Sequence, residues 1–224
     1  MQSKRSSQKA EAAGPRGLRE LVEFDAAARG IFQDMDEQLI QGRLAFLKAA
    51  EALKDTLRSG HTAGGRSEST AEHSWRLCLL ALAFEDQLPG VDMLRLLKLC
   101  IVHDLGEAIH GDIPAVAQVD KEAKQLQERQ DMLELTASLD APLRTQVMSL
   151  WEEYDAAETP EARLAKALDK LETVLQHNQG KNPPGFDYAF NLGYGQHHTA
   201  AHPLTAAIRA ILDRETCDRM NSGQ

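Results

Sequence analysis

Apolar residues recur along most of the chain at the spacing of amphipathic helices. Between Asp36 and Arg58 they fall three or four residues apart, which places them on one face of a helix. The run from Val91 to Val102 is almost continuously apolar and predicts a helix that is buried on most of its sides. Further helices are expected over residues 120–139, 143–154 and 202–219.

Two local signals mark where other helices begin. Ser69 is followed three residues later by Glu72, a capping box that predicts a helix with its apolar face at Leu77, Leu80, Ala81 and Phe84. Pro160 favours a helix start, and the apolar stripe behind it is Leu164, Leu168, Leu171 and Leu175. The Gly-, Ser- and Thr-rich segment from Ser59 to Thr70 predicts a loop of about a dozen residues, a length that is often functional.

The pattern as a whole predicts an all-α fold. No stretch shows sustained alternation of apolar and polar residues, so strands are not expected. Residues 1–20 carry five basic and two acidic side chains and are rich in Ser, Gln, Ala and Gly, which predicts a flexible basic tail. Residues 21–224 are expected to form a single compact helical bundle.

The composition narrows the classes of partner. The chain has 25 Lys and Arg against 34 Asp and Glu, a net charge of −9, which argues against binding a nucleic-acid polymer. No apolar run approaches the roughly 18 residues that a membrane span needs. The amino-terminal residues are polar and show no secretory signal. The three cysteines, an odd number without CxxC spacing, predict reduced thiols in the cytoplasm: Cys78, Cys100 and Cys217.

Two histidines fall on the inner faces of predicted helices. His73 lies on the apolar face that follows the capping box, and His103 ends the most apolar helix, directly before Asp104. A single inward-facing histidine is usually a core residue satisfied by hydrogen bonds, and this interpretation stays open for each. A His–Asp pair is a stronger signal, because an unpaired buried carboxylate costs on the order of several kcal/mol. No Lys or Arg occurs between Lys98 and Lys121, so a metal ion is expected to balance the charge.

Asp169 is a second carboxylate within an apolar stripe. Taken alone, it is also typical of a solvent-exposed helix edge. With His73, His103 and Asp104 it would supply two imidazoles and two carboxylates from three helices. Such a set suits a single divalent ion, whether Mn, Co, Ni, Zn, Fe or Mg. Open coordination positions would bind a phosphate oxygen and a water, which becomes a hydroxide nucleophile near neutral pH.

Three segments that carry these residues resemble the HD-domain phosphohydrolases, and within them the small 5′-deoxynucleotidases. They are Glu68–Arg76 (ESTAEHSWR), Ile101–Pro114 (IVHDLGEAIHGDIP) and Ala167–Glu172 (ALDKLE). The H…HD…D pattern, extended by HDxxE and GDxP, covers the core motifs at residues 44–177 and leaves 178–224 as a carboxy-terminal helical extension. The resemblance implies a homodimer that removes the 5′-phosphate from (deoxy)nucleoside monophosphates.

The resemblance also implies roles for individual residues. His73, His103, Asp104 and Asp169 match the metal ligands, and Glu107 matches the catalytic carboxylate that orients or deprotonates the attacking water. Asp112 matches an acid on the leaving-group side, although Gly-Asp is also a common turn. Arg58 resembles an arginine that reaches the substrate; as a bare feature it is a charge at the end of the first long helix. Members of the family usually carry a tryptophan just after that arginine to stack on the base, whereas His61 is the nearest aromatic ring here.

Two other functions fit the same residues. One keeps the fold but changes the substrate to a phosphodiester, a nucleoside triphosphate or another phosphorylated metabolite. The other is a catalytically silent helical module that binds a nucleotide or a protein partner.

Only one histidine, His110, lies between Asp104 and Asp169, which favours a single ion over the two-metal set of HD phosphodiesterases and oxygenases.

Overall fold

The computed structural model describes residues 37–112 and 121–222. Residues Gly42–Gln224 belong to one compact unit, and the fold described below is that of this unit. The predicted basic tail and the Ile113-Pro114 end of the GDxP motif lie outside the described residues. None of the helices in the described ranges is both long and apolar enough to cross a membrane.

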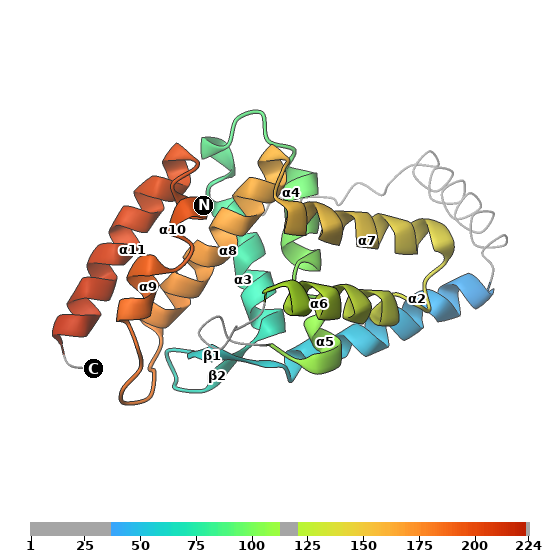
Figure 1. Cartoon of the computed structure of the whole chain (residues 1–224), viewed down its shortest axis with the longest axis horizontal. Helices are drawn as coiled ribbons and strands as arrows, with labels where there is room; N and C mark the ends of the chain where they lie inside the picture. Colours follow the sequence, from blue (N-terminus) through green and yellow to red (C-terminus); the bar gives the residue numbers. More distant parts are fainter. Residues whose placement is uncertain (1–36, 113–120, 223–224) are drawn as a thin grey trace, which may run out of the picture. The chain divides into compact units, whose positions relative to one another are not determined.

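The fold is all-α apart from one short hairpin, as Figure 1 shows. In chain order the elements are α2 (Glu37–Ala50), the 3-10 helix η1 (Glu51–Lys54), β1 (Leu57–His61), β2 (Ser67–Ser69), α3 (Thr70–Ala83), the 3-10 helix η2 (Glu85–Gln87), α4 (Met93–Val102), α5 (Glu107–His110), α6 (Lys121–Leu135), α7 (Ala141–Ala156), α8 (Pro160–Gln179), α9 (Ala189–Gly193), α10 (Gln196–Thr199) and α11 (Pro203–Asn221). The predicted fold class is confirmed.

The prediction of one continuous helix from Asp36 to Arg58 is wrong, and so is the absence of strands. The helix ends at Ala50, and after η1 the chain enters the antiparallel pair β1–β2. The main chain of Thr56 accepts a hydrogen bond from the Thr70 nitrogen at 2.9 Å, which closes the hairpin. Strands of five and three residues are too short to show alternation, and their pairing overrides the helical spacing.

The predicted helix starts are confirmed. Ser69 and Glu72 form the complete capping box at the start of α3. The hydroxyl of Thr159 accepts a hydrogen bond from the Ala162 nitrogen at 3.2 Å, with Pro160 in the first turn of α8. Each cap satisfies a backbone donor that the helix itself leaves unpaired.

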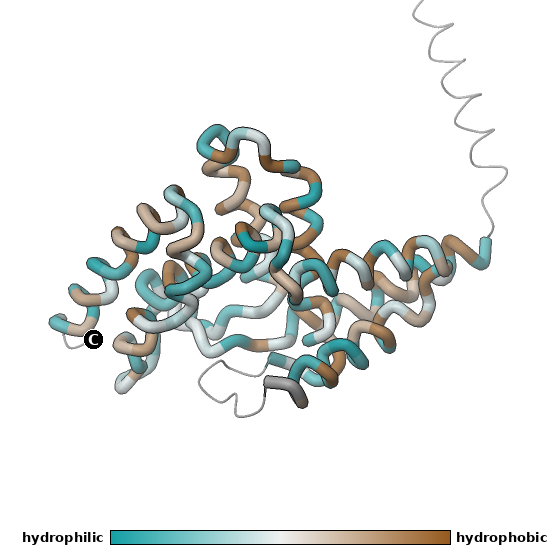
Figure 2. Tube along the Cα trace, turned by 45° about the horizontal axis from the view of Figure 1, so that its top comes forward, coloured by the Kyte–Doolittle hydropathy of each residue, from teal (hydrophilic) through white to brown (hydrophobic). Residues whose placement is uncertain are grey.

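Helix α8 is the central element of the unit and packs against α3, α4, α7, α10, α11 and β1. Hydropathy along the helices switches between polar and apolar within single turns, the mark of amphipathic helices (Figure 2). The apolar faces of α3, α4 and α8 form the main core, which includes Leu77, Ala81, Leu96, Leu99, Cys100, Leu164, Leu168, Leu171 and Val174. This core surrounds the last turns of α4, and the candidate site begins where that helix ends.

A second apolar cluster joins α6 and α7 to the segment after α4. It contains Leu53, Val102, Leu105, Met132, Leu135, Leu139, Val147, Met148 and Trp151. Trp151 is therefore a core aromatic, whereas Trp75 on α3 is 63% exposed. All three cysteines are free thiols.

The burial of α4 gives a test of the fold. Leu99 is fully buried and Leu94, on the same helix, is 64% exposed. We expect Leu99→Ala to lower the free energy of unfolding by about 2 to 5 kcal/mol, because it removes buried methyl groups and leaves a cavity. The matched variant Leu94→Ala should change it by less than about 1 kcal/mol. Urea unfolding followed by circular dichroism measures both; equal effects would contradict the assignment of the buried face.

Candidate metal centre

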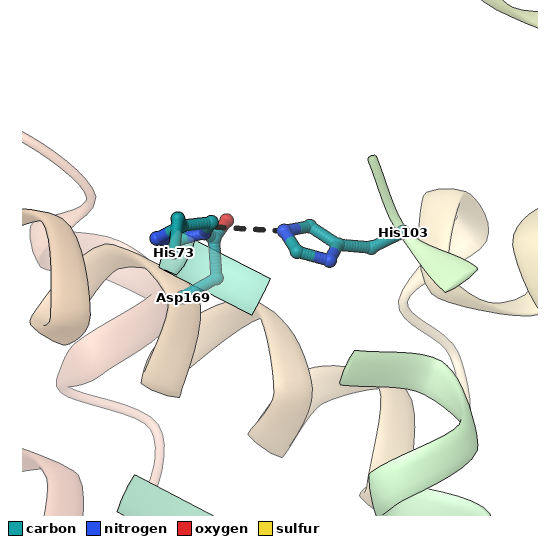
Figure 3. Close-up of side chains that lie close together, drawn as sticks. All are labelled: His73, His103 and Asp169. Carbon is teal, nitrogen blue, oxygen red and sulfur yellow. Dashed lines mark ion pairs between the residues drawn. The ribbon is translucent and has the colours of Figure 1, made fainter. Parts of the chain in front are cut away.

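The four predicted ligands come together inside the bundle. His73 lies on α3, His103 and Asp104 follow the last turn of α4, and Asp169 lies on α8. Nε2 of His73 is 3.2 Å from Oδ1 of Asp169 and 3.9 Å from Oδ2 of Asp104. Nε2 of His103 is 3.0 Å from Oδ2 of Asp104 and 4.0 Å from Oδ1 of Asp169. Figure 3 shows the two imidazole rings and the Asp169 carboxylate converging on one point.

The outer nitrogen of each imidazole is committed to an acceptor of the protein, which leaves the inward Nε2 as the atom that faces a ligand. Nδ1 of His103 donates to the carbonyl of Cys100 at 2.9 Å, and Nδ1 of His73 pairs with Glu172. Both Nε2 atoms are buried and have no hydrogen-bond partner among the described residues. Buried nitrogens of this kind are rare unless a ligand satisfies them. Two imidazole nitrogens with two carboxylates therefore fit a divalent metal ion.

Asp169 is held by its outer oxygen. Oδ2 accepts from the hydroxyl of Tyr154 at 2.7 Å and lies 2.8 Å from Nζ of Lys170, so that Oδ1 faces His73. Burial alone would raise the pKa of Asp169, but Lys170 and the two histidines outweigh it and hold the pKa well below its ordinary value. The carboxylate is thus ionised and fixed in orientation.

The cluster as a whole favours positive charge. Burial and Arg58 would lower the pKa of His73, yet Glu172 and Asp169 raise it to about 10. The negative potential that raises this pKa would also attract a metal cation, which would take the place of the proton.

Arg58 reaches the same cluster from β1, not from the end of a long helix as its sequence position suggests. Its Nη1 lies 3.3 Å from Oδ2 of Asp104, and its Nη2 donates to the hydroxyl of Thr173 at 3.2 Å. Burial would lower the pKa of Arg58, but Asp104, Asp169 and other nearby carboxylates raise it. A cation therefore does lie next to Asp104 in the folded protein, although none is near it in the sequence. The argument for a metal ion rests instead on the unpartnered imidazole nitrogens.

Glu107 opens α5 directly after the His103-Asp104 turn. Its Oε2 accepts a hydrogen bond from the fully buried Thr70 hydroxyl at 2.9 Å. Burial first, and then the charges of Asp104 and Asp112, raise the pKa of Glu107 to about 9. A carboxylate in this setting holds a proton far more tightly than one in water.

Asp112 lies close to Asp104 and Arg58, whereas no hydrogen bond of His61 reaches the cluster. Burial is the main reason that the pKa of Asp112 is raised, Asp104 adds to it, and Arg58 opposes it. Asp112 follows Gly111, whose φ of +84° favours glycine at the turn. The hydrogen-bond partners of His61 within the described chain are Ser67, Gln176 and Asn182, and none of them belongs to the cluster.

Sequence reasoning missed several side chains that hold the site. Glu68, Thr70, Tyr154 and Glu172 are all buried against it. Glu172 had a readable signal, since it follows Asp169 by three residues and so lies on the same helix face. Tyr154 had none, because its contact with Asp169 depends on how α7 packs on α8.

Comparison with known proteins agrees with this geometry. The model of the HD domain family matches residues 50–209. A 5′-deoxynucleotidase HDDC2 from Danio rerio is 38% identical over 186 residues, covering 80% of this chain and 90% of that protein. The HDDC2 of Homo sapiens is 34% identical over 138 residues, covering 61% and 67%.

Solved structures show the same relationship. A predicted metal-dependent phosphohydrolase from Magnetospirillum magnetotacticum MS-1 superposes with a TM-score of 0.69 at 27% identity, covering 82% of this chain and 95% of that one. The PH0347 protein from Pyrococcus horikoshii OT3 has a TM-score of 0.58 at 25% identity, covering 77% and 98%. The resemblance seen in the sequence motifs is confirmed, and the chain belongs to the HD-domain family of metal-dependent phosphohydrolases.

Proposed function

We propose that this protein is a metal-dependent 5′-nucleotidase that releases phosphate from nucleoside monophosphates and prefers deoxynucleotides. The observation that carries the proposal is the convergence of His73, His103, Asp104 and Asp169 with both inward imidazole nitrogens unpartnered. The names of the relatives support a monophosphate substrate. They give no support to a phosphodiester or triphosphate substrate or to a silent binding module.

The four residues would hold one divalent ion, Mn, Co, Ni, Zn, Fe or Mg. When bound, this ion polarises a phosphoryl oxygen and lowers the pKa of water. His110 is not expected to add a further ligand, because it belongs to none of the groups of candidate ligands within the described residues and its side chain is 60% exposed. A single ion is therefore the simplest occupant of the site.

The chain's own residues would carry the proton transfers and balance the charge. Thr70 fixes Glu107 through Oε2 and leaves Oε1 to accept the proton of the attacking water. Burial and the neighbouring acids raise the pKa of Glu107, and the positive charge of a bound ion would lower it again, so that the carboxylate is ionised when it accepts this proton. The Arg58 guanidinium would face the negative charge that builds on the phosphoryl group. Asp112, whose pKa is raised, would give a proton to the departing ribose oxygen.

His61 takes the place of the stacking tryptophan in this proposal. Its Nδ1 is buried and has no hydrogen-bond partner in the described part of the chain. The ring would contact the sugar or the base, with a smaller stacking surface than an indole offers. We further propose that the enzyme is a cytoplasmic homodimer.

The substrate class can be tested with a panel of nucleoside mono-, di- and triphosphates and a phosphodiester, assayed for phosphate release with Mn²⁺ or Co²⁺. We expect turnover of monophosphates, deoxy forms above ribo forms, and loss of turnover on chelation with EDTA. Release of phosphate from none of the monophosphates with any of the proposed metals would sink the proposal.

Two variants check the residue roles within that assay. Asp169→Asn and Glu107→Ala should each lower kcat by a factor of about 100 or more, because one removes a ligand charge and the other the base. Full turnover in either variant would show that its role is wrong even if the activity is right.

Two arginines of the hairpin region should behave differently. Arg58→Ala should raise KM and lower kcat for a monophosphate, since its guanidinium lies inside the site. Arg66→Ala is the matched control, because Nη1 and Nη2 of Arg66 are both committed to Glu72, at 2.8 and 2.5 Å. Arg66→Ala should leave kcat/KM unchanged while the pKa of Glu72, which the Arg66 pair holds at about 2, returns toward its ordinary value. Steady-state kinetics and NMR titration measure the two effects; a rise in KM in Arg66→Ala would assign Arg66 to phosphate binding and contradict its use as a control.

An exposed apolar stripe on α3 supports the proposed dimer. Trp75, Leu79 and Leu82 share one face of the helix and are 63%, 42% and 47% exposed. We expect sedimentation velocity to show twice the 24.7 kDa chain mass, and Leu79→Glu to give monomers. Leu126→Glu, at another exposed apolar position, should leave the dimer intact. A wild-type monomer would refute the dimer without touching the proposed activity.

A further inference from the structure

A second group of carboxylates lies on the far side of His73 from the metal centre. The Nδ1 atom faces the fully buried Glu172, and Glu68 lies close by. Ligand atoms of Glu68, His73 and Glu172 all fall within 4.8 Å of one another. By spacing alone, this group is either a second cation site or a set of residues that supports the first.

The charges around this group favour the second possibility, a set of residues that supports the first site. Nε of Arg76 lies 2.6 Å from Oε1 of Glu172, and Nε of Arg58 lies 3.7 Å from Oε2 of Glu68. Each acid therefore already faces a guanidinium. A second metal on Nδ1 would also require His73 to lose the proton through which it pairs with Glu172.

The same spacing recurs on the two helices that meet here. On α3, Arg76 follows His73 by three residues; on α8, Glu172 follows Asp169 by three. Residues three apart share a helix face, so each helix presents one metal-facing residue and one residue of the ion pair behind it. Arg76 is anchored further along α8 by its Nη1, which donates to Oε1 of Gln179 at 3.0 Å.

We propose that Glu172 and Arg76 are positioning residues that hold His73 in the tautomer and orientation needed to bind the metal. This inference rests on the metal centre proposed above. Glu172 accepts a hydrogen bond from the protonated Nδ1 and so keeps the lone pair on Nε2, while Arg76 fixes the second oxygen of the same carboxylate. The charged acceptor also makes the imidazole a stronger donor to a metal than a neutral acceptor would.

His103 provides an internal comparison. Its Nδ1 donates to the neutral backbone carbonyl of Cys100 at 2.9 Å, with no ion pair behind it. The two imidazoles therefore differ in support, and a change at Glu172 should affect one of them only.

The experiment measures metal binding rather than turnover. Wild type, Glu172→Gln and Arg76→Met are treated with EDTA and titrated with Mn²⁺ by calorimetry, with circular dichroism as the check on folding. We expect Glu172→Gln to weaken Mn²⁺ binding by about 10- to 100-fold. Arg76→Met should weaken it less, and should add little in the Glu172→Gln background, because it acts through the same carboxylate.

Arg95→Met is the matched control. Arg95 pairs with Glu153 at 2.6 Å, a contact as short as that of Arg76 with Glu172. It lines the surface of α4 away from the ligands, so its loss should leave Mn²⁺ affinity unchanged.

A second readout reports on the imidazoles directly. In the Zn²⁺-loaded protein, the Nδ1 proton of His73 should give a far-downfield NMR signal that moves upfield in Glu172→Gln, while the His103 signal stays in place. A folded Glu172→Gln variant with wild-type affinity and an unmoved His73 signal would overturn the inference. Should that variant not fold, Arg76→Lys, which keeps the charge but not the fork geometry, decides it by the same two measurements. Wild-type protein that binds no divalent ion would instead overturn the metal centre itself.

Discussion

The buried contact between His73 on α3 and Asp169 on α8 is the constraint on which the rest of the unit depends. Neither side chain can be hydrated, so each must be met by partners of matching charge or hydrogen-bonding capacity. Tyr154 and Lys170 meet Asp169, and Glu172 meets His73. A shift of either helix by one residue would turn these charges into the surrounding apolar core. The polar centre thus sets the register of α3 against α8, while apolar burial supplies most of the free energy.

The same centre explains how an acidic protein can act on an anion. Six buried or half-buried carboxylates share one electrostatic network: Glu68, Asp104, Glu107, Asp112, Asp169 and Glu172. Among the described residues, the Arg and Lys side chains that pair with them directly are Arg58, Arg76 and Lys170. The excess negative charge is what a divalent cation would neutralise. The overall charge of −9 therefore disfavours a large anionic partner such as a nucleic-acid polymer. It does not determine the sign of the electrostatic potential at the site.

The sequence was sufficient to predict most of the long helices, the starts of α3 and α8 and the inward placement of His73 and Asp169, because each depends on local spacing. The set of four proposed ligands followed from the family resemblance. An apolar face predicts burial, and a His or Asp on that face is buried with it, as His73 and Asp169 are. What could not be predicted was every contact made across elements. Arg58 reaches Asp104 over 46 positions of sequence and Tyr154 reaches Asp169 through helix packing. No local pattern encodes such pairs.

The hairpin β1–β2 shows why the contacts that could not be predicted from the sequence lie at the functional site. β1 runs so close to α8 that a Cβ on Gly60 would lie 3.2 Å from Cγ of Gln176 and 3.3 Å from Cδ2 of His177. A glycine there lets the backbone approach, and this approach brings Arg58, two residues earlier, into the acid cluster. A continuous helix would satisfy the local spacing better but would leave Asp104 without that guanidinium. The local preference gives way because a buried carboxylate costs more than a lost turn of helix.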